Sequence, residues 1–292
     1  MTEKKLTVKG VEWEYVTGGR GPQTLLMFHG AVGGAETMQW LADAFAHEYR
    51  TIAPTVAGVR TLEEVCDAAS AILDREHVGR AVVFGGSFGG LIAQAFLKRR
   101  WRQVEHLVLL STGAPSPAVG AKNAKVMKFM RLMPFPLMRA LMKLELGKHL
   151  QAPTASPEHS ERVHLFRQRL NDYLDHKLTK QTFLSRIELS IDFNLRESYG
   201  PDEYADWPGR VLLVESNDDP MIPAAERARL KAAYPRALVC TFEGAGHMIT
   251  LLRQEELVGV VRAFLKEDYG MPPQEAEHCP LHVDHQEEVR DL

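Results

Sequence analysis

The chain alternates short apolar runs with longer segments in which apolar residues recur at helical spacing. Residues 11–16 (VEWEYV) alternate apolar and polar positions, which predicts a strand with one face in solvent. Other short runs are apolar throughout and predict strands buried on both faces: 24–28, 51–53, 81–84, 107–110, 211–214 and 238–242. Helical periodicity predicts helices near 36–47, 61–77, 88–100, 224–233 and 254–267. This order predicts an α/β fold, with a mostly parallel central sheet and helices on both faces.

Two segments break the alternation. Between 107–110 and 211–214 the pattern predicts helices without a convincing strand, and Pro134 and Pro136 divide its Met-rich stretch 125–146 in two. We therefore expect residues 1–112 and 209–267 to form the core domain. Residues 113–208 would then form an inserted helical cap over the strand ends. The tail, 268–292, is polar and lacks periodicity, so we expect it to be flexible.

Composition and charge narrow the class of protein. The chain has 292 residues, 45% of them hydrophobic, which is enough for a substantial core. A net charge of -3 and a pI near 6.5 give no reason to expect a nucleic acid or an anionic membrane surface as partner. Three cysteines are too few for a disulfide framework, which favours a reducing, cytoplasmic location. Neither a signal peptide nor an apolar run of membrane-spanning length is evident.

The stretch AVVFGGSFGGLIAQAF, 81–96, places Ser87 among four glycines between a predicted buried strand and a predicted helix. It has three interpretations: a reactive serine on a strained turn, a flexible connection, or a phosphate-binding loop. The spacing excludes the phosphate loop, because no G-x-G-x-x-G register exists and no G-K-[ST] follows. A lone G-x-S-x-G is weak evidence, yet the strand–turn–helix setting favours a nucleophile, with Gly85 and Gly89 leaving room for a sharp turn.

A serine nucleophile needs a base to take its proton and a third group to orient that base. His247 follows the predicted strand 238–242 and sits in a loop with Gly244 and Gly246, which favours it as the base. The acid has two candidates after strand 211–214, Asp218 and Asp219. Either gives the chain order Ser, Asp, His that is typical of one class of serine hydrolase.

The motifs FHG (28–30), GGSFGG (85–90), DDPMIP (218–223) and GAGH (244–247) occur in this order, and with them the chain resembles the serine-nucleophile α/β-hydrolases. The resemblance extends over 11–112 and 209–266. It favours Asp219 over Asp218 as the acid and implies that His29 is structural. It further implies a catalytic triad of Ser87, Asp219 and His247. The two backbone N–H donors of an oxyanion hole would be those of Ala31 (or Val32) and Phe88. The resemblance implies no cofactor and no metal.

The chain departs from many members of that family after the fourth predicted strand. Where they carry an acidic residue and a G-x-G-x-S stretch, this sequence has APTVAGVRTLEEV (53–65). With FGGSFGGLIAQAF, this short connection is similar to maspardin and its bacterial relatives, a looser match. Maspardin resembles a hydrolase that has lost part of its triad, so a partner-binding protein with a vestigial site is an alternative. Because all three triad residue types are present, we favour an enzyme.

Two residue clusters lie outside these motifs. Methionines recur in the predicted cap at spacings of three to five and could pack the cap or line an apolar substrate surface: Met127, Met130, Met133, Met138 and Met142. In the tail His278, Cys279, His282 and His285 have a spacing compatible with metal ligands, but without an ordered framework we expect no metal site.

The sequence predicts a serine hydrolase that cleaves a carboxylic ester or related acyl bond through an acyl-enzyme intermediate. The Met-rich cap favours a small-molecule substrate with an apolar acyl or alcohol group. Acyl transfer and carbon–carbon bond cleavage on the same triad remain alternatives, and homo-oligomerisation is left open.

Overall fold

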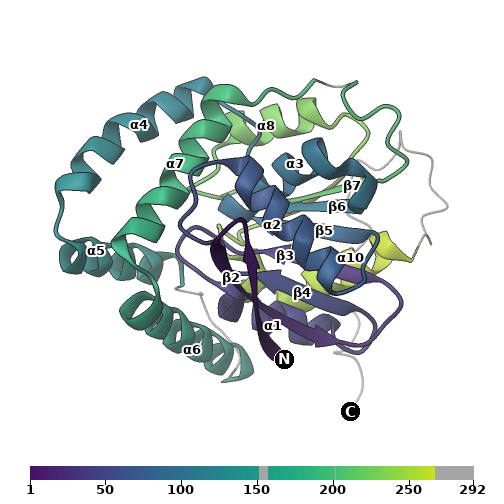
Figure 1. The fold of residues 1–292 in the computed structure, drawn as a ribbon, viewed down its shortest axis with the longest axis horizontal. Helices are drawn as coiled ribbons and strands as arrows, with labels where there is room; N and C mark the ends of the chain where they lie inside the picture. Colours follow the sequence, from purple (N-terminus) through teal and green to yellow (C-terminus); the bar gives the residue numbers. More distant parts are fainter. Residues whose placement is uncertain (151–156, 201, 267–292) are drawn as a thin grey trace, which may run out of the picture.

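The computed structural model describes residues 1–150, 157–200 and 202–266 and contains an eight-stranded sheet. The strand order is β1-β2-β4-β3-β5-β6-β7-β8, in which β1–β2 and β2–β4 pair antiparallel and the other neighbours pair parallel (Figure 1). The strands are β1 Thr2–Val8, β2 Val11–Gly19, β3 Thr24–Phe28, β4 Arg50–Pro54, β5 Ala81–Gly86, β6 Val104–Leu110, β7 Val211–Ser216 and β8 Leu238–Phe242. The predicted α/β fold with a mostly parallel sheet is confirmed.

The sequence analysis missed β1. This strand lies at the sheet edge and is largely exposed, so its sequence TEKKLTV carries little apolar signal. Its connection to β2 is the two-residue turn Lys9-Gly10, with φ of 49° and 82°. Two consecutive positive φ angles are typical of the tight hairpin turns that match strand twist.

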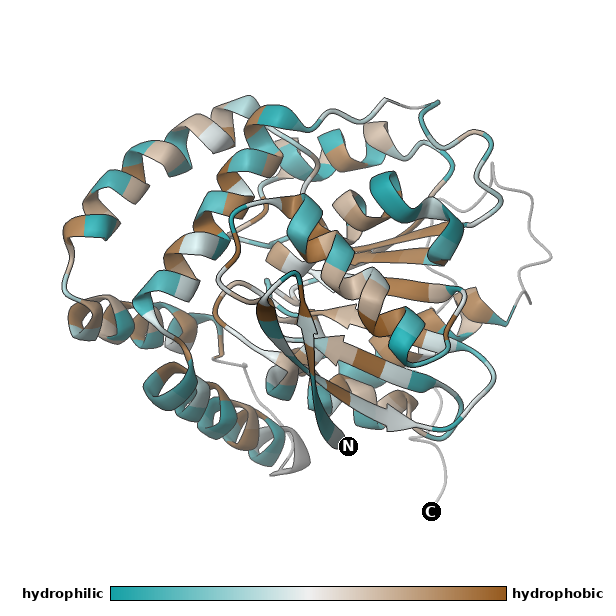
Figure 2. Cartoon of the chain, viewed as in Figure 1, coloured by the Kyte–Doolittle hydropathy of each residue, from teal (hydrophilic) through white to brown (hydrophobic). Residues whose placement is uncertain are grey.

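Helices cover both faces of the sheet. They are α1 Ala35–Phe45, α2 Leu62–Arg75, α3 Phe88–Arg100, α8 Ala224–Ala233, α9 Ile249–Leu252 and α10 Gln254–Leu265. Residues of α2, α3 and α8 pack with Leu26 and Val83 in one apolar layer, whereas residues of α1 and α10 pack with Leu25 and Val82 in the other. Successive strand residues thus enter opposite layers, which explains the continuous apolar runs of the central strands (Figure 2).

Between β6 and β7 the chain forms a helical insertion of four α-helices. They are α4 Pro117–Leu132, α5 Phe135–His149, α6 Pro157–Asp172 and α7 Lys180–Arg196, and no strand occurs in the described part of 117–196. The break between α4 and α5 contains Pro134 and lies next to Pro136, as predicted. In Figure 1, α4, α5 and α6 lie to the left of the sheet, with α7 between α4 and the core.

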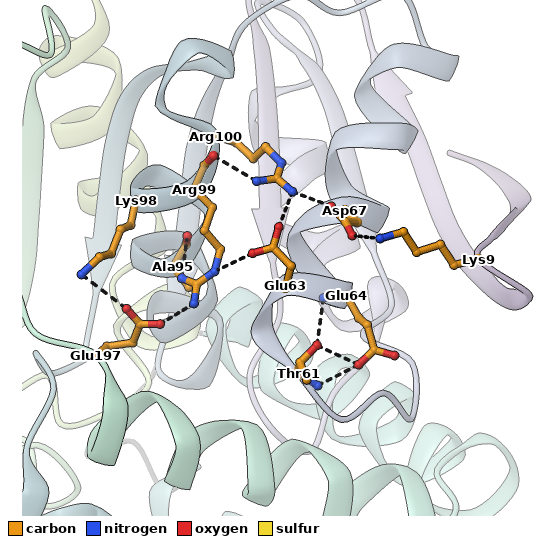
Figure 3. A network of polar contacts seen from close by, with 10 residues as sticks. All are labelled: Lys9, Thr61, Glu63, Glu64, Asp67, Ala95, Lys98, Arg99, Arg100 and Glu197. Carbon is orange, nitrogen blue, oxygen red and sulfur yellow. Dashed lines mark hydrogen bonds and ion pairs between the residues drawn. The ribbon is translucent and has the colours of Figure 1, made fainter.

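Ion pairs join α2, α3 and the end of α7 (Figure 3). Arg99 pairs with Glu63 and Glu197, and Arg100 pairs with Glu63 and Asp67. The basic end of α3 therefore anchors one end of the helical insertion to the core. Figure 3 also shows the capping box of α2, in which the Thr61 side chain and Glu64 exchange hydrogen bonds with each other's backbone N–H.

Candidate active site

The loops that follow five parallel strands meet at one edge of the sheet and surround a cavity of about 300 Å³. Ser87 follows β5 and His247 follows β8, and both line this cavity. Ala31 and Val32, which follow β3, line it too. Helix α5 of the insertion contributes Met142 and other side chains, so the insertion forms one wall of the cavity.

Ser87 lies on a strained turn between β5 and α3. Its φ of 52° and ψ of -122° are unusual for a residue with a side chain. The turn is held on both sides, because the Ser87 N–H donates to the Leu110 carbonyl at 2.9 Å and Thr112 Oγ1 donates to the Ser87 carbonyl at 2.8 Å. Phe88 is the first residue of α3, directly after the serine.

Two of the four neighbouring glycines have no room for a side chain against backbone. A Cβ on Gly85 would lie 2.3 Å from the Gly89 carbonyl oxygen, and one on Gly89 would lie 2.1 Å from the Phe28 carbonyl oxygen. At Gly90 the obstacle is the Thr112 side chain at 2.6 Å, whereas at Gly86 the nearest atom is 3.7 Å away. Gly85 and Gly89 therefore let β5, α3 and the end of β3 approach closely.

Asp219 lies against His247. Its Oδ2 and Oδ1 are 2.9 and 3.1 Å from His247 Nδ1, and both side chains are almost fully buried. Asp219 Oδ1 also accepts the N–H groups of Met221 and Ile222 at 2.8 and 3.0 Å. These bonds fix the carboxylate, and the carboxylate in turn fixes the imidazole orientation with Nε2 left for other partners.

Asp218 faces a different set of groups. Its Oδ1 accepts from the Ser216 hydroxyl at 2.6 Å and from the Gly246 N–H at 2.8 Å. The hydrogen bond from Ser216, followed by that from Gly246, lowers the pKa of the Asp218 carboxyl. Asp218 thus joins the loop after β7 to the loop that carries His247, and it makes no contact with the imidazole among the hydrogen bonds of the described chain.

His29 belongs to the loop after β3 and is fully buried. Its Nε2 accepts the Val56 N–H at 2.9 Å, and its Nδ1 lies 2.7 Å from the Gly30 carbonyl oxygen, which assigns the proton to Nδ1. Burial, with a smaller effect of the nearby Arg186 charge, keeps the His29 pKa well below its ordinary value. Because a trans peptide points its N–H opposite to its C=O, the bond to the Gly30 carbonyl also fixes the direction of the Ala31 N–H.

Arg186 of α7 also binds this loop, and the sequence analysis did not find it. The residue is fully buried, and its guanidinium donates to the carbonyls of Ala31 at 3.0 Å, Gly33 at 2.6 Å and Val56 at 2.7 Å. It also donates to the Tyr173 hydroxyl at 2.8 Å. The available signal was a single cation within an otherwise apolar stripe of α7, whose buried positions include Phe183, Leu189 and Phe193.

Ser111 is a second residue that the sequence analysis missed. It follows β6 and lies between Leu110 and Thr112, both of which bond to the backbone of Ser87. Its φ is 44°, it is 4% exposed, and its hydroxyl has no hydrogen-bond partner within the described chain. Since Ser111 lines the same cavity as Ser87, a polar atom without a partner in the described chain is left near Ser87.

The rest of the cavity wall is largely apolar and includes Phe28, Phe84, Leu110, Met142, Leu146, Phe166, Leu170 and Met248. Apart from His247, the ionisable side chains of the described wall are Glu145 and His149 of α5; it contains no Lys or Arg. Of the methionines singled out in the sequence, Met142 alone lines the cavity, while Met127 and Met138 are buried in packing.

Within the described residues, no group of His, Cys, Asp and Glu is suited to hold a metal ion, and no helix is long and apolar enough to cross a bilayer. The tail predicted to be flexible, with His278, Cys279, His282 and His285, lies outside the described residues.

A family model described as the alpha/beta hydrolase family matches residues 25–260, so the chain belongs to this family. A 2-hydroxy-6-oxononadienedioate/2-hydroxy-6-oxononatrienedioate hydrolase of Cupriavidus pinatubonensis is 24% identical, over 84% of this chain and 89% of that protein. An enzyme of the same name from Paraburkholderia phymatum is 26% identical, over 78% and 82%.

Solved structures support the same fold. A thermophilic esterase from Thermogutta terrifontis has a TM-score of 0.71 at 19% identity, covering 91% of this chain and 98% of its own. The meta-cleavage product hydrolase CumD of Pseudomonas fluorescens has a TM-score of 0.67 at 20% identity, covering 90% and 97%. Proteins similar to this chain are thus hydrolases of more than one bond type.

Proposed function

We propose that this protein is a serine hydrolase that cleaves a carboxylic ester or a related acyl bond. Ser87 is the nucleophile, His247 the general base and Asp219 the residue that orients the imidazole. The observation that carries the proposal is the Asp219–His247 pair beside a cavity that also holds the strained Ser87. Strain at a single residue in such a place is a common sign of catalytic use.

The proposed reaction has two steps, acylation of Ser87 and hydrolysis of the acyl-enzyme. Ser87 Oγ attacks the carbonyl carbon while His247 Nε2 takes the hydroxyl proton, and the backbone N–H groups of Ala31 (or Val32) and Phe88 stabilise the oxyanion. The tetrahedral intermediate expels the alcohol, which receives the proton from His247. Water then attacks the acyl-enzyme with His247 again as the base, which releases the acid and restores Ser87.

The cavity favours a neutral, apolar substrate. Its wall is dominated by Phe, Leu and Met side chains, and the described part of the wall supplies no Lys or Arg for a carboxylate. We propose that residues 113–208 act as a cap that selects such a substrate through α5. A panel of p-nitrophenyl esters should show fastest turnover on uncharged acyl chains, and fastest turnover on charged ones would reject this preference.

A second candidate is hydrolysis of a carbon–carbon bond on the same triad. The similar proteins of Cupriavidus and Paraburkholderia, named as hydrolases of 2-hydroxy-6-oxo dioates, favour it. A dianionic substrate of that kind would meet Glu145 and no Lys or Arg in the described wall. Incubation with such a dioate and with a neutral ester, followed by product analysis, separates the two activities.

Labelling with an alkyl fluorophosphonate tests the catalytic proposal. We expect stoichiometric modification of Ser87, no modification of Ser87→Ala, and loss of ester turnover in that variant. If the folded protein resists the probe and Ser87→Ala behaves as the parent protein does, the partner-binding alternative of the maspardin type replaces the enzyme.

A further inference from the structure

The helical insertion has an outer face that the proposed reaction does not use. Within the described chain, ten large hydrophobic side chains are conspicuously exposed, and six of them lie on α4 and α5. They are Val126, Phe129, Leu132, Leu137, Leu141 and Leu144, with exposed fractions from 46% to 85%. A monomeric soluble protein rarely gathers so much apolar surface on two adjoining helices, so this face is a candidate contact surface.

Each helix separates its apolar residues between two sides. On α4, Met127 is buried and Met130 packs in the core of the insertion, whereas Phe129 and Leu132 point outward. On α5, Met138 is buried and Met142 lines the cavity, whereas Leu141 and Leu144 are exposed. The methionines therefore account for internal packing, and the outer Phe and Leu side chains have no such use. Figure 2 shows the apolar segments recurring along both helices.

The charge of this region differs from that of the whole chain. Residues 117–149 contain seven Lys and Arg and one Glu, a net charge of +6, although the whole chain carries -3. Helix α4 has four cations and no acidic residue. Three of them, Lys122, Lys125 and Lys128, are exposed, and no hydrogen bond or ion pair is found for them within the described residues, whereas Arg131 pairs with Glu188.

We propose that α4 and α5 form a docking surface for bilayers that contain anionic phospholipid. Exposed Phe and Leu beside free Lys is the composition of helices that lie in the interface of an anionic membrane. A second copy of the chain fits less well, because a two-fold contact would bring the cationic α4 helices of both copies together. The proposal goes beyond the hydrolase activity and does not depend on it.

Docking through the outer side of α5 would bring the cavity close to the lipid. The opposite side of α5 carries Met142, Leu146 and His149, which line the same cavity as Ser87. A protein seated on the bilayer through the outer side of α5 would thus hold this cavity within one helix diameter, about 10 Å, of the lipid.

Vesicle flotation tests the proposal with the full-length protein. Vesicles of phosphatidylcholine alone are compared with equimolar phosphatidylcholine and phosphatidylglycerol. We expect binding to the anionic vesicles that weakens as salt is raised. Phe129→Ser with Leu132→Ser, and separately Lys122→Gln with Lys125→Gln, should each weaken binding at least about tenfold. Far-ultraviolet circular dichroism and thermal unfolding check that the variants are folded, whatever their activity.

The matched control is Arg20→Gln with Arg75→Gln, which removes the same charge from two exposed positions outside the insertion. It should leave vesicle binding within twofold of the parent protein. The proposal is overturned if the parent protein does not float with anionic vesicles, or if the control weakens binding as much as the lysine pair does. It is also overturned if light scattering shows a dimer that Phe129→Ser with Leu132→Ser dissociates while vesicle binding is absent.

Discussion

At the scale of single residues, the turn at Ser87 depends on neighbouring glycines that carry no side chain. A non-glycine residue at a positive φ costs on the order of 1–3 kcal/mol, and such a conformation persists only where its surroundings hold it. Here the hydrogen bonds to Leu110 and Thr112 hold the serine backbone. Because Gly85 and Gly89 have no side chain, β5, α3 and the end of β3 can approach one another closely.

Gly89→Ala and Gly86→Ala should therefore differ sharply. The methyl group at position 89 meets the Phe28 carbonyl oxygen at 2.1 Å, and backbone cannot yield as a flexible side chain can. We expect a loss of about 3 kcal/mol in the free energy of unfolding for Gly89→Ala and less than about 1 for Gly86→Ala, whose nearest neighbour is 3.7 Å away. Urea unfolding followed by circular dichroism measures both free energies. Equal losses in the two variants would show that the close approach of backbone to Gly89 does not limit the side chain at this position.

The two adjacent aspartates provide a second matched comparison. Asp219→Asn places an amide against His247 Nδ1 and weakens control of the imidazole tautomer, so kcat should fall roughly 10³–10⁴-fold. Asp218→Asn keeps an oxygen acceptor for the Gly246 N–H and should lower kcat less than about tenfold. Ester turnover at saturating substrate measures both. A larger loss in Asp218→Asn would reassign the acid.

Replacement of Ser111 by alanine tests whether its buried hydroxyl contributes to stability. Its buried hydroxyl lacks a partner in the described chain, so its removal leaves no newly unpaired group. Serine and alanine are similarly strained at a φ of 44°, and the substitution isolates the hydroxyl. We expect Ser111→Ala to unfold at the same free energy or up to about 1 kcal/mol higher in urea. A clear loss of stability would mean that the hydroxyl has a partner in solution.

Sequence reasoning found the candidate residues that follow strand ends and missed those fixed only by packing. Ser87, Asp219 and His247 each stand after a buried apolar run with local turn residues, so their convergence could be predicted from parallel-sheet geometry. Arg186 lies in the middle of a helix, 155 positions from the carbonyl of Ala31 that it binds. No local pattern encodes that contact.

At the scale of elements, α7 is the helix of the insertion whose buried Arg186 bonds to the backbone of the loop after β3. Its Arg186 joins the helix to the loop after β3 and to the loop after β4, through Gly33 and Val56. The periodicity of 113–208 predicted helices, but not which of them contacts the core, because that depends on how the insertion packs. The edge strand β1 was missed for the opposite reason, since a largely exposed strand shows almost no apolar pattern.

Arg186→Met should uncouple α7 from the loop after β3. The change leaves carbonyls of that loop without their donor, and we expect the free energy of unfolding to fall by about 3 kcal/mol. Because one of the two proposed oxyanion donors, the N–H of Ala31 (or Val32), lies in this loop, kcat should fall more than KM rises. Arg186→Lys should be intermediate, since an ammonium cannot reproduce the planar fork.

The control for this prediction is Arg196→Met at the exposed end of the same helix, where the guanidinium pairs with Asp192 alone among the described residues. It should change stability by less than about 0.5 kcal/mol and leave kcat unchanged. If Arg186→Met alters stability with no change in kcat, Arg186 is structural and does not position the oxyanion loop.

At the scale of the whole molecule, charge is distributed unevenly. The net charge is -3, yet α4 and α5 carry an excess of cations, so the overall composition concealed a basic region.

A buried charge and a buried histidine link the candidate site to the stability of the whole protein. The positive Arg186 of α7 binds the loop that contains the neutral His29, and burial disfavours a second positive charge there.

This arrangement predicts how stability changes with pH. The His29 pKa is lowered in the folded protein, so below the ordinary histidine pKa of 6.5 the unfolded chain takes up a proton that the native protein does not. Stability should therefore be fully present above that pH and fall by about 1.4 kcal/mol per pH unit below it from this residue alone. Carboxyls with lowered pKa values, such as Asp218, add their loss only at lower pH, near and below 3.8. Urea unfolding between about pH 7.5 and about pH 5 should show this slope, and His29→Gln should be less stable at the upper end with a shallower slope. Parallel curves for the two proteins would show that His29 is not the group that titrates.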